Sequence, residues 1–222
     1  MKIAVLGAGN VGGALGKLWA GRGHEVRFGV PDPRSQKTTA LLASMGGRAQ
    51  AGSNREAAGV SEVVVLSVPW PAAEQAIRDC GDLKSKVVIG AVNHHLRFKV
   101  VIDCTNPLRA DFQGLAVGTT TSAAEQVAAW SGAKVVKAFN TLGAGNFGHA
   151  EFGGTRADGF YCGDDETAKN KVKPLIAEIG LNPVDVGPLR NGRLLEALAM
   201  LWIDLALNQK WGTNHAFKLL RR

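Results

Sequence analysis

Three glycines near the start of the chain have the spacing of a phosphate-binding turn. Gly7, Gly9 and Gly12 form a Gly-x-Gly-x-x-Gly pattern directly after a short apolar run. In a turn from strand to helix, the first glycine permits the tight turn, the second lets the backbone approach a pyrophosphate, and the third allows close packing. The helix would open with Asn10 and Val11, whose free N–H groups favour phosphate. We therefore predict a dinucleotide site at this turn, against the alternative of an ordinary glycine-rich turn.

The residues after the second predicted strand bear on the choice between NAD and NADP. NAD-specific sites end this strand with an acid that binds the ribose 2′-hydroxyl, whereas here it runs into Val30. Two cations that follow, Arg34 and Lys37, suit the extra 2′-phosphate of NADP. Asp32 argues for NAD unless it is a turn residue. The pattern favours NADP, with NAD as the alternative.

The sequence contains no signature of a nucleophile that would form a covalent intermediate. Lys137 and His149 are the only candidates for proton transfer. Hydride transfer between two ring systems needs neither, because the protein has only to hold donor and acceptor carbons about 3–3.5 Å apart. We therefore expect no catalytic side chain and a redox coenzyme as hydride partner. The alternatives are a reductase of a small imine or keto acid, with one of these two residues as general acid, and a non-catalytic NADP-binding sensor.

Composition excludes several other classes of function. The three cysteines and five histidines lack metal-ligand spacing, so no metal site is expected. The formal charge of +7 is spread along the chain without a nucleic-acid motif, which favours anionic coenzymes over nucleic acid as partners. The first apolar run is too short for a signal peptide, and none reaches the roughly 20 residues that span a bilayer. We expect a cytoplasmic protein with no membrane partner.

The elements that must position these residues alternate between short apolar strands and helices. This rhythm predicts an α/β fold of the Rossmann type, a doubly wound parallel sheet with helices on both faces. The predicted helices cover 10–22, 34–45 and a stretch from a Pro-Trp-Pro turn to 78, and the predicted strands cover 2–6, 24–28, 62–66, 100–103, 134–139 and 159–162.

The last third of the chain has a different pattern. An amphipathic helix is predicted over 166–179 and a very apolar one over 191–208. We divide the chain into a dinucleotide-binding Rossmann domain, 1–155, and a smaller, mostly helical C-terminal region, 156–222. The second helix is too apolar to face water on all sides, so it is buried in the core or in a dimer interface. A homodimer is expected.

Several segments resemble the NADPH-dependent coenzyme F420 reductases (F420H2:NADP oxidoreductases) and the related oxidoreductase domain of the STEAP metalloreductases. The likeness covers nearly the whole chain. It implies hydride transfer between NADP(H) and a deazaflavin (coenzyme F420) or a flavin. The segments are IAVLGAGNVGG (3–13), VLSVPW (65–70), IDCTNPL (102–108), VVKAFNTLGA (135–144), YCGDD (161–165) and DVGPLRNGRLLEAL (185–198).

The resemblance also implies where the two coenzymes bind. The glycine turn would hold the pyrophosphate, and residues after the later strands would line the path to the nicotinamide and hold its amide and the flavin-like ring. Each has a structural alternative as a turn former, a core cover or a strand-end cap. The implied residues are Val68, Pro69 and Trp70 after one strand, Asn106 and Pro107 after the next, and Asn140, Thr141 and Ala144 after the third.

The chain departs from the family pattern at three places. Val30-Pro31 stands where F420 reductases often carry Ser-Arg for the 2′-phosphate, and Asn140 stands where they can have His. Residues 90–98 lie between two copies of KVVI, and we interpret them as an insertion that forms a hairpin or an extra edge strand. These departures leave the electron acceptor open between F420, a flavin and some other acceptor.

Overall fold

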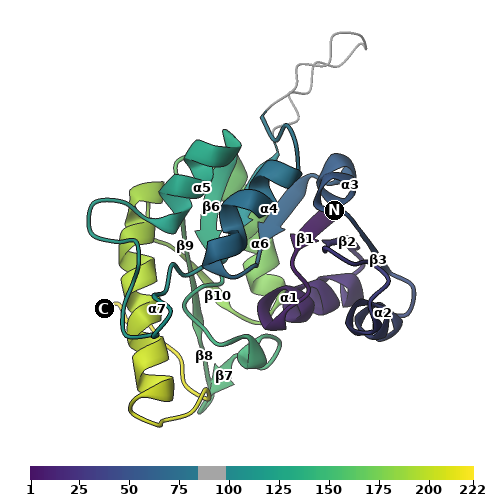
Figure 1. Cartoon of the computed structure of the whole chain (residues 1–222). Helices are drawn as coiled ribbons and strands as arrows, with labels where there is room; N and C mark the ends of the chain where they lie inside the picture. Colours follow the sequence, from purple (N-terminus) through teal and green to yellow (C-terminus); the bar gives the residue numbers. More distant parts are fainter. Residues whose placement is uncertain (85–98) are drawn as a thin grey trace.

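Eight strands form one sheet in the computed structural model, which describes residues 1–84 and 99–222. They lie in the order β10-β9-β6-β5-β4-β1-β2-β3 (Figure 1). Neighbours are parallel except for β6 and β9. This confirms the predicted Rossmann-type sheet. The strands are β1 Lys2–Leu6, β2 Glu25–Gly29, β3 Ala49–Gly52, β4 Val63–Leu66, β5 Val100–Asp103, β6 Lys134–Ala138, β9 Asp158–Gly163 and β10 Asn182–Asp185.

The antiparallel pair departs from the all-parallel prediction, and the connection explains it. Parallel neighbours need a crossover, usually a helix. Between β6 and β9 the chain instead passes through a 3-10 turn, η2 (Ala144–Asn146), and a two-stranded ribbon of β7 (Glu151–Phe152) and β8 (Thr155–Arg156). The strand β9 therefore re-enters the sheet in the opposite direction. A crossover through α6 (Glu166–Glu178) then makes β10 parallel to β9, so both strands continue the sheet begun in 1–155.

Helices cover both faces of the sheet because alternate strand residues point to opposite sides. In β1, Ile3 and Val5 pack in one core cluster and Ala4 and Leu6 in the other. The first face is covered by α1 (Asn10–Gly21), α2 (Gln36–Ala43) and α6, and the second by α3 (Asn54–Val60), α4 (Ala73–Asp79) and α5 (Ala123–Ser131).

The long C-terminal helix α7 (Gly192–Leu207) lies beside β9, on the side of the molecule away from α2 (Figure 1). It follows a 3-10 turn, η3 (Leu189–Asn191), and buries Leu195 against β9. Its outer face leaves Leu194 and Leu201 66% and 49% exposed. The predicted helix is confirmed, but the protein core covers only one of its faces.

Two strands of the eight-stranded sheet, β3 and β10, and two helices, α3 and α5, were missed from the sequence, as was the ribbon of β7 and β8. The strands β3 and β10 are short and lie at the two edges of the sheet, where Pro183 is tolerated because an edge strand need not donate every N–H. The helix α3 has a readable signal, the capping box formed by Ser53 and Glu56. The predicted insertion at 90–98 lies outside the described residues. Across the described ranges, no helix is both long enough and apolar enough to cross a bilayer.

Candidate functional site

The winding of the chain reverses at β1, which lies between β2 and β4. In open α/β sheets, ligands bind beyond the carboxyl ends of the strands at such a switch point. The glycine turn begins here with Gly7 in a left-handed conformation, φ +95°, and the Gly7 N–H donates to the Gly29 carbonyl at the end of β2 over 2.9 Å. The turn is therefore held at the predicted crevice.

The other two glycines of the turn have opposite surroundings. A Cβ on Gly12 would lie 2.2 Å from the Gly7 oxygen and 2.4 Å from Ser67 Oγ, so close packing requires glycine there. A Cβ on Gly9 would meet no atom of residues 1–84 and 99–222 within 4 Å, and its φ of −80° suits any residue. The protein itself does not require glycine at position 9. Open space at the N-terminus of α1, which begins with exposed Asn10 and half-buried Val11, fits the approach of a pyrophosphate.

The end of β4 supports the same turn. Ser67 Oγ donates to the Leu6 carbonyl over 2.8 Å and to the Gly7 carbonyl over 3.3 Å, and the Val68 side chain lies against Gly7. Sequence reasoning did not single out Ser67, although it lies within VLSVPW. Pro69 is exposed, at the start of the 3-10 turn η1 (Trp70–Ala72).

The Trp70 side chain packs on the core between α4 and α5. Its ring stacks on Trp130 with centroids 5.4 Å apart and an interplanar angle of 26°. Trp70 therefore covers part of the core at the start of η1.

The ends of β5 and β6 are joined by two asparagines. Asn106 Nδ2 donates to the Asn140 carbonyl and Asn140 Nδ2 donates to Asn106 Oδ1, both over 3.0 Å. Asn140 Nδ2 also donates to the Leu195 carbonyl of α7, over 3.1 Å. Asn140 Oδ1 is buried and finds no hydrogen-bond partner among the described residues. A buried acceptor without a partner is costly unless a ligand supplies a donor. Pro107 and Thr141 are buried beside the pair, and Ala144 is half-buried at the start of η2.

Phe139, which lies between the end of β6 and Asn140, has a strained backbone conformation. Its φ of +65° is unusual for a bulky residue. The ring is buried in edge-to-face contacts with Trp19 and Phe147, at centroid distances of 5.6 and 6.3 Å. Such strain persists only where packing over-determines it, and it clusters at functional sites.

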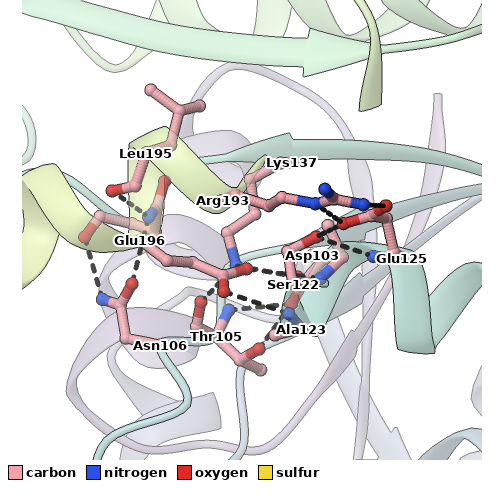
Figure 2. A network of polar contacts seen from close by, with 12 residues as sticks. Asp103, Thr105, Asn106, Ser122, Ala123, Glu125, Lys137, Arg193, Leu195 and Glu196 are labelled. Carbon is pink, nitrogen blue, oxygen red and sulfur yellow. Dashed lines mark hydrogen bonds and ion pairs between the residues drawn. The ribbon is translucent and has the colours of Figure 1, made fainter. Parts of the chain in front are cut away.

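A fully buried ion triad of Lys137, Asp103 and Glu196 joins the ends of β5 and β6 to α7 (Figure 2). Lys137 Nζ is 2.9 Å from Asp103 Oδ2 and 2.8 Å from Glu196 Oε1. Burial opposes the charge, but the two carboxylates raise the pKa of Lys137 above its usual value. Lys137 therefore stays charged and enclosed between the two carboxylates. It is not placed to act as the general acid for which it was a candidate. His149, the other candidate, is exposed on the loop after η2.

The predicted 2′-phosphate cations lie on the surface after β2. Arg34 and Lys37 are exposed, and neither side chain has an ion-pair partner within residues 1–84 and 99–222. Ser35 caps α2 by accepting from the Thr38 N–H over 3.3 Å. Asp32 Oδ1 accepts the Arg34 N–H over 2.9 Å, so Asp32 is a turn residue.

The cysteines offer neither nucleophiles nor ligands. Burial raises the pKa of Cys80 and of Cys162 to about 12, and that of Cys104 well above its usual value. The thiols are therefore protonated at neutral pH. Over the described part of the chain, no three His, Cys, Asp or Glu side chains gather in a way that could hold a metal ion.

Comparison with known proteins places this geometry in a family. A sequence model of the family described as "NADP oxidoreductase coenzyme F420-dependent" matches residues 2–94. The F420-dependent NADP reductase of Methanothermobacter marburgensis is 30% identical over 224 residues, covering 95% of this chain and 94% of that protein. The metalloreductase STEAP3 of Rattus norvegicus is 27% identical over 90% of this chain and 36% of its own length.

A solved structure has the same fold from end to end. The putative F420-dependent NADP reductase from Arthrobacter sp. FB24 superposes with a TM-score of 0.85 at 28% identity, covering 100% of both chains. The segments that suggested the resemblance from the sequence thus belong to a likeness along the whole chain. The chain is a member of the coenzyme F420-dependent NADP oxidoreductase family.

Proposed function

We propose that the chain transfers hydride between NADP(H) and coenzyme F420, with reduced F420 plus NADP giving F420 plus NADPH, or the reverse. One observation carries the proposal. Beyond the strand ends of one crevice, this chain of the family has an open glycine at a helix N-terminus and a buried amide oxygen with no partner among the described residues. The first fits a pyrophosphate and the second fits a ligand N–H. When bound, the two coenzymes supply the redox chemistry.

The residues of the turn bind and orient NADP in this proposal. The N–H groups of Asn10 and Val11 and the positive end of the α1 dipole face the pyrophosphate. The exposed cations Arg34 and Lys37 take the 2′-phosphate, which selects NADP over NAD. Val68 and Pro69 line the path from adenosine to nicotinamide.

The residues after β5 and β6 orient the reacting rings. The Asn140 side chain is held by the two hydrogen bonds that its Nδ2 donates, to Asn106 Oδ1 and to the Leu195 carbonyl. Its Oδ1 is then free to accept an N–H of the coenzyme. Pro107, Thr141 and Ala144 present small, mostly buried surface that excludes water. Catalysis then rests on alignment of donor and acceptor carbons rather than on a proton-transferring side chain.

Reduction of a small imine or keto acid is less well supported. It needs a general acid beside the nicotinamide, and Lys137 is sealed between two carboxylates. A sensor role predicts that NADPH binds without being oxidised, so the assay described next tests this role too.

The test is NADPH oxidation by the purified protein, followed by absorbance with F420, FMN, FAD or no acceptor in parallel. We expect oxidation with F420. Turnover with FMN or FAD alone would replace F420 by a flavin. Tight NADPH binding without oxidation in any reaction would contradict the proposed activity.

We also propose that the exposed face of α7 forms a homodimer. Leu194 and Leu201 lie one above the other at a spacing of two helical turns, with exposed Ala197 between them. An apolar stripe of this kind on a helix is typical of an interface. Light scattering should give twice the chain mass for the wild type and the chain mass for Leu194→Glu/Leu201→Glu. A wild-type monomer at micromolar concentration would contradict the dimer.

A further inference from the structure

The ion triad of Lys137, Asp103 and Glu196 has no role in the chemistry described so far. All three side chains are fully buried, and both carboxylates contact the Lys137 ammonium. Removing charges from water is costly, and apolar residues of similar volume often stabilise a core equally well. Stability alone therefore does not account for the triad. The triad belongs to the ends of the two strands that lead to Asn106 and Asn140, so it is placed to hold these residues in position.

Each member of the triad lies within three residues, along the chain, of Asn106, Asn140 or Leu195. Asp103 is the last residue of β5, three residues before Asn106, and Lys137 precedes Asn140 by three residues in β6. Glu196 follows Leu195, whose carbonyl accepts from Asn140 Nδ2. The triad thus joins β5, β6 and α7, the three elements that lead into Asn106, Asn140 and Leu195 (Figure 2).

A second set of bonds fixes the backbone between Asp103 and Asn106. Asp103 Oδ1 accepts the Thr105 N–H over 2.9 Å and the Thr105 hydroxyl over 2.7 Å. Lys137 Nζ donates to the Thr105 carbonyl over 2.5 Å. The residue before Asn106 is therefore held from both its N–H and its C=O by members of the triad.

Glu196 also connects the triad to α5. Its two carboxylate oxygens accept the N–H groups of Ala123 and Ala124, over 3.0 and 3.3 Å, in the first turn of that helix. Every oxygen of the triad and the single ammonium thus have a defined partner. A fully satisfied buried polar network of this kind holds one arrangement of the elements that it joins.

We propose that Lys137, with Asp103 and Glu196, is a positioning network that sets the Asn106–Asn140 pair and, through it, the nicotinamide ring for hydride transfer. This inference rests on the proposed function, because it assigns the ring to the crevice beyond β5 and β6. The two halves of the coenzyme should therefore respond differently to changes in the network. The adenosine half lies over the glycine turn and β2, which the network does not touch, whereas the nicotinamide half depends on the network.

The test measures binding of the adenosine half and hydride transfer at the nicotinamide half separately, in variants that keep the shape of the core. Glu196→Gln is isosteric and leaves Lys137 with one carboxylate, and Lys137→Met removes the ammonium. For both we expect an unchanged dissociation constant for 2′,5′-ADP, which lacks the nicotinamide. The single-turnover rate of hydride transfer from NADPH should fall roughly tenfold or more, since a misplacement of 1 Å can cost about 100-fold.

Lys169→Met is the matched control. Lys169 is also a buried lysine with two carboxylate partners, Asp185 at 2.8 Å and Glu166 at 2.6 Å, but it joins α6 to β10. This variant should keep the wild-type rate. If Lys137→Met does not fold, Glu196→Gln carries the test alone.

The outcomes separate this inference from the function on which it rests. A wild-type protein that neither binds NADPH nor transfers hydride would overturn both. With an active wild type, unchanged rates in folded triad variants would overturn the positioning role. Equal losses of affinity for 2′,5′-ADP and NADPH would also overturn it, because they would indicate a general disturbance of the fold.

Discussion

Gly9 and Gly12 lie three residues apart in one turn, yet a methyl group would meet open space at the first and two oxygens within 2.4 Å at the second. The same residue type therefore serves two purposes that the sequence pattern does not separate. Gly12 serves the packing of α1 on the sheet, and the space at Gly9 serves a ligand.

Alanine substitutions should separate these purposes. Gly9→Ala should fold with nearly wild-type stability, because its backbone is extended and the added methyl touches nothing. Its affinity for NADPH should fall roughly tenfold or more, about 1.4 kcal/mol, because the methyl occupies the space of the pyrophosphate. Gly12→Ala should lose about 1–3 kcal/mol of stability through overpacking. Calorimetric titration and urea unfolding measure the two effects. Wild-type NADPH affinity in Gly9→Ala would show that the pyrophosphate lies elsewhere.

Removal of the two cations after β2 should change the preference between dinucleotides. Arg34→Ala/Lys37→Ala is expected to weaken NADPH binding by about 1.5–3 kcal/mol, the scale of hydrogen bonds to a charged group, and to leave NADH binding little changed. Arg156→Ala/Lys173→Ala removes the same charge from exposed positions elsewhere and should affect neither. Equal losses for NADPH and NADH, measured by fluorescence titration, would remove the case for a 2′-phosphate contact.

Loss of the buried ammonium should be costly for folding. Lys137→Met leaves Asp103 and Glu196 buried without a counter-charge, and breaking a buried ion pair costs about 3–5 kcal/mol. Lys169→Met should cost less, because the side chains of its partners Glu166 and Asp185 are 76% and 36% exposed. Urea unfolding of both variants gives the comparison. Similar losses of stability in the two variants would mean that water or local rearrangement stabilises the carboxylates of Asp103 and Glu196 after Lys137 is removed.

Acid should weaken the contact between α5 and α7. The Arg193 guanidinium, with Ser122, holds the pKa of Glu125 below its usual 4.5. A carboxyl with a lowered pKa in the folded state contributes stability that is complete above its unfolded pKa and is lost as pH falls through its folded pKa. Glu125→Gln should therefore be less stable than the wild type by about 1 kcal/mol at pH 6, the upper range for a partly exposed pair.

The difference between Glu125→Gln and the wild type should shrink below pH 4.5 as the wild-type carboxyl becomes protonated. Glu151→Gln is the control, because Glu151 is exposed and has no ion pair within the described residues. A difference between Glu125→Gln and the wild type that stays constant down to pH 3 would contradict the assigned pair.

Sequence alone determined the features that depend on local patterns. The glycine turn, the apolar strands β1 and β4 to β6, and the two C-terminal helices were predicted because each is specified by neighbouring residues through period or turn chemistry. The strands β3 and β10 were missed because short edge strands with polar or small residues carry little of that signal. The antiparallel entry of β9 was missed because it depends on a connection rather than on the strand itself.

Only the tertiary structure decided which residues meet at the crevice. Lys137 reads as a free lysine next to a strand end, and its partner Asp103 lies 34 residues away in the chain. The positive φ of Phe139 and the unpartnered oxygen of Asn140 depend on packing by distant side chains. These features arise from contacts between residues far apart in sequence, and no local pattern of residue types encodes the distance between two side chains that only folding brings together.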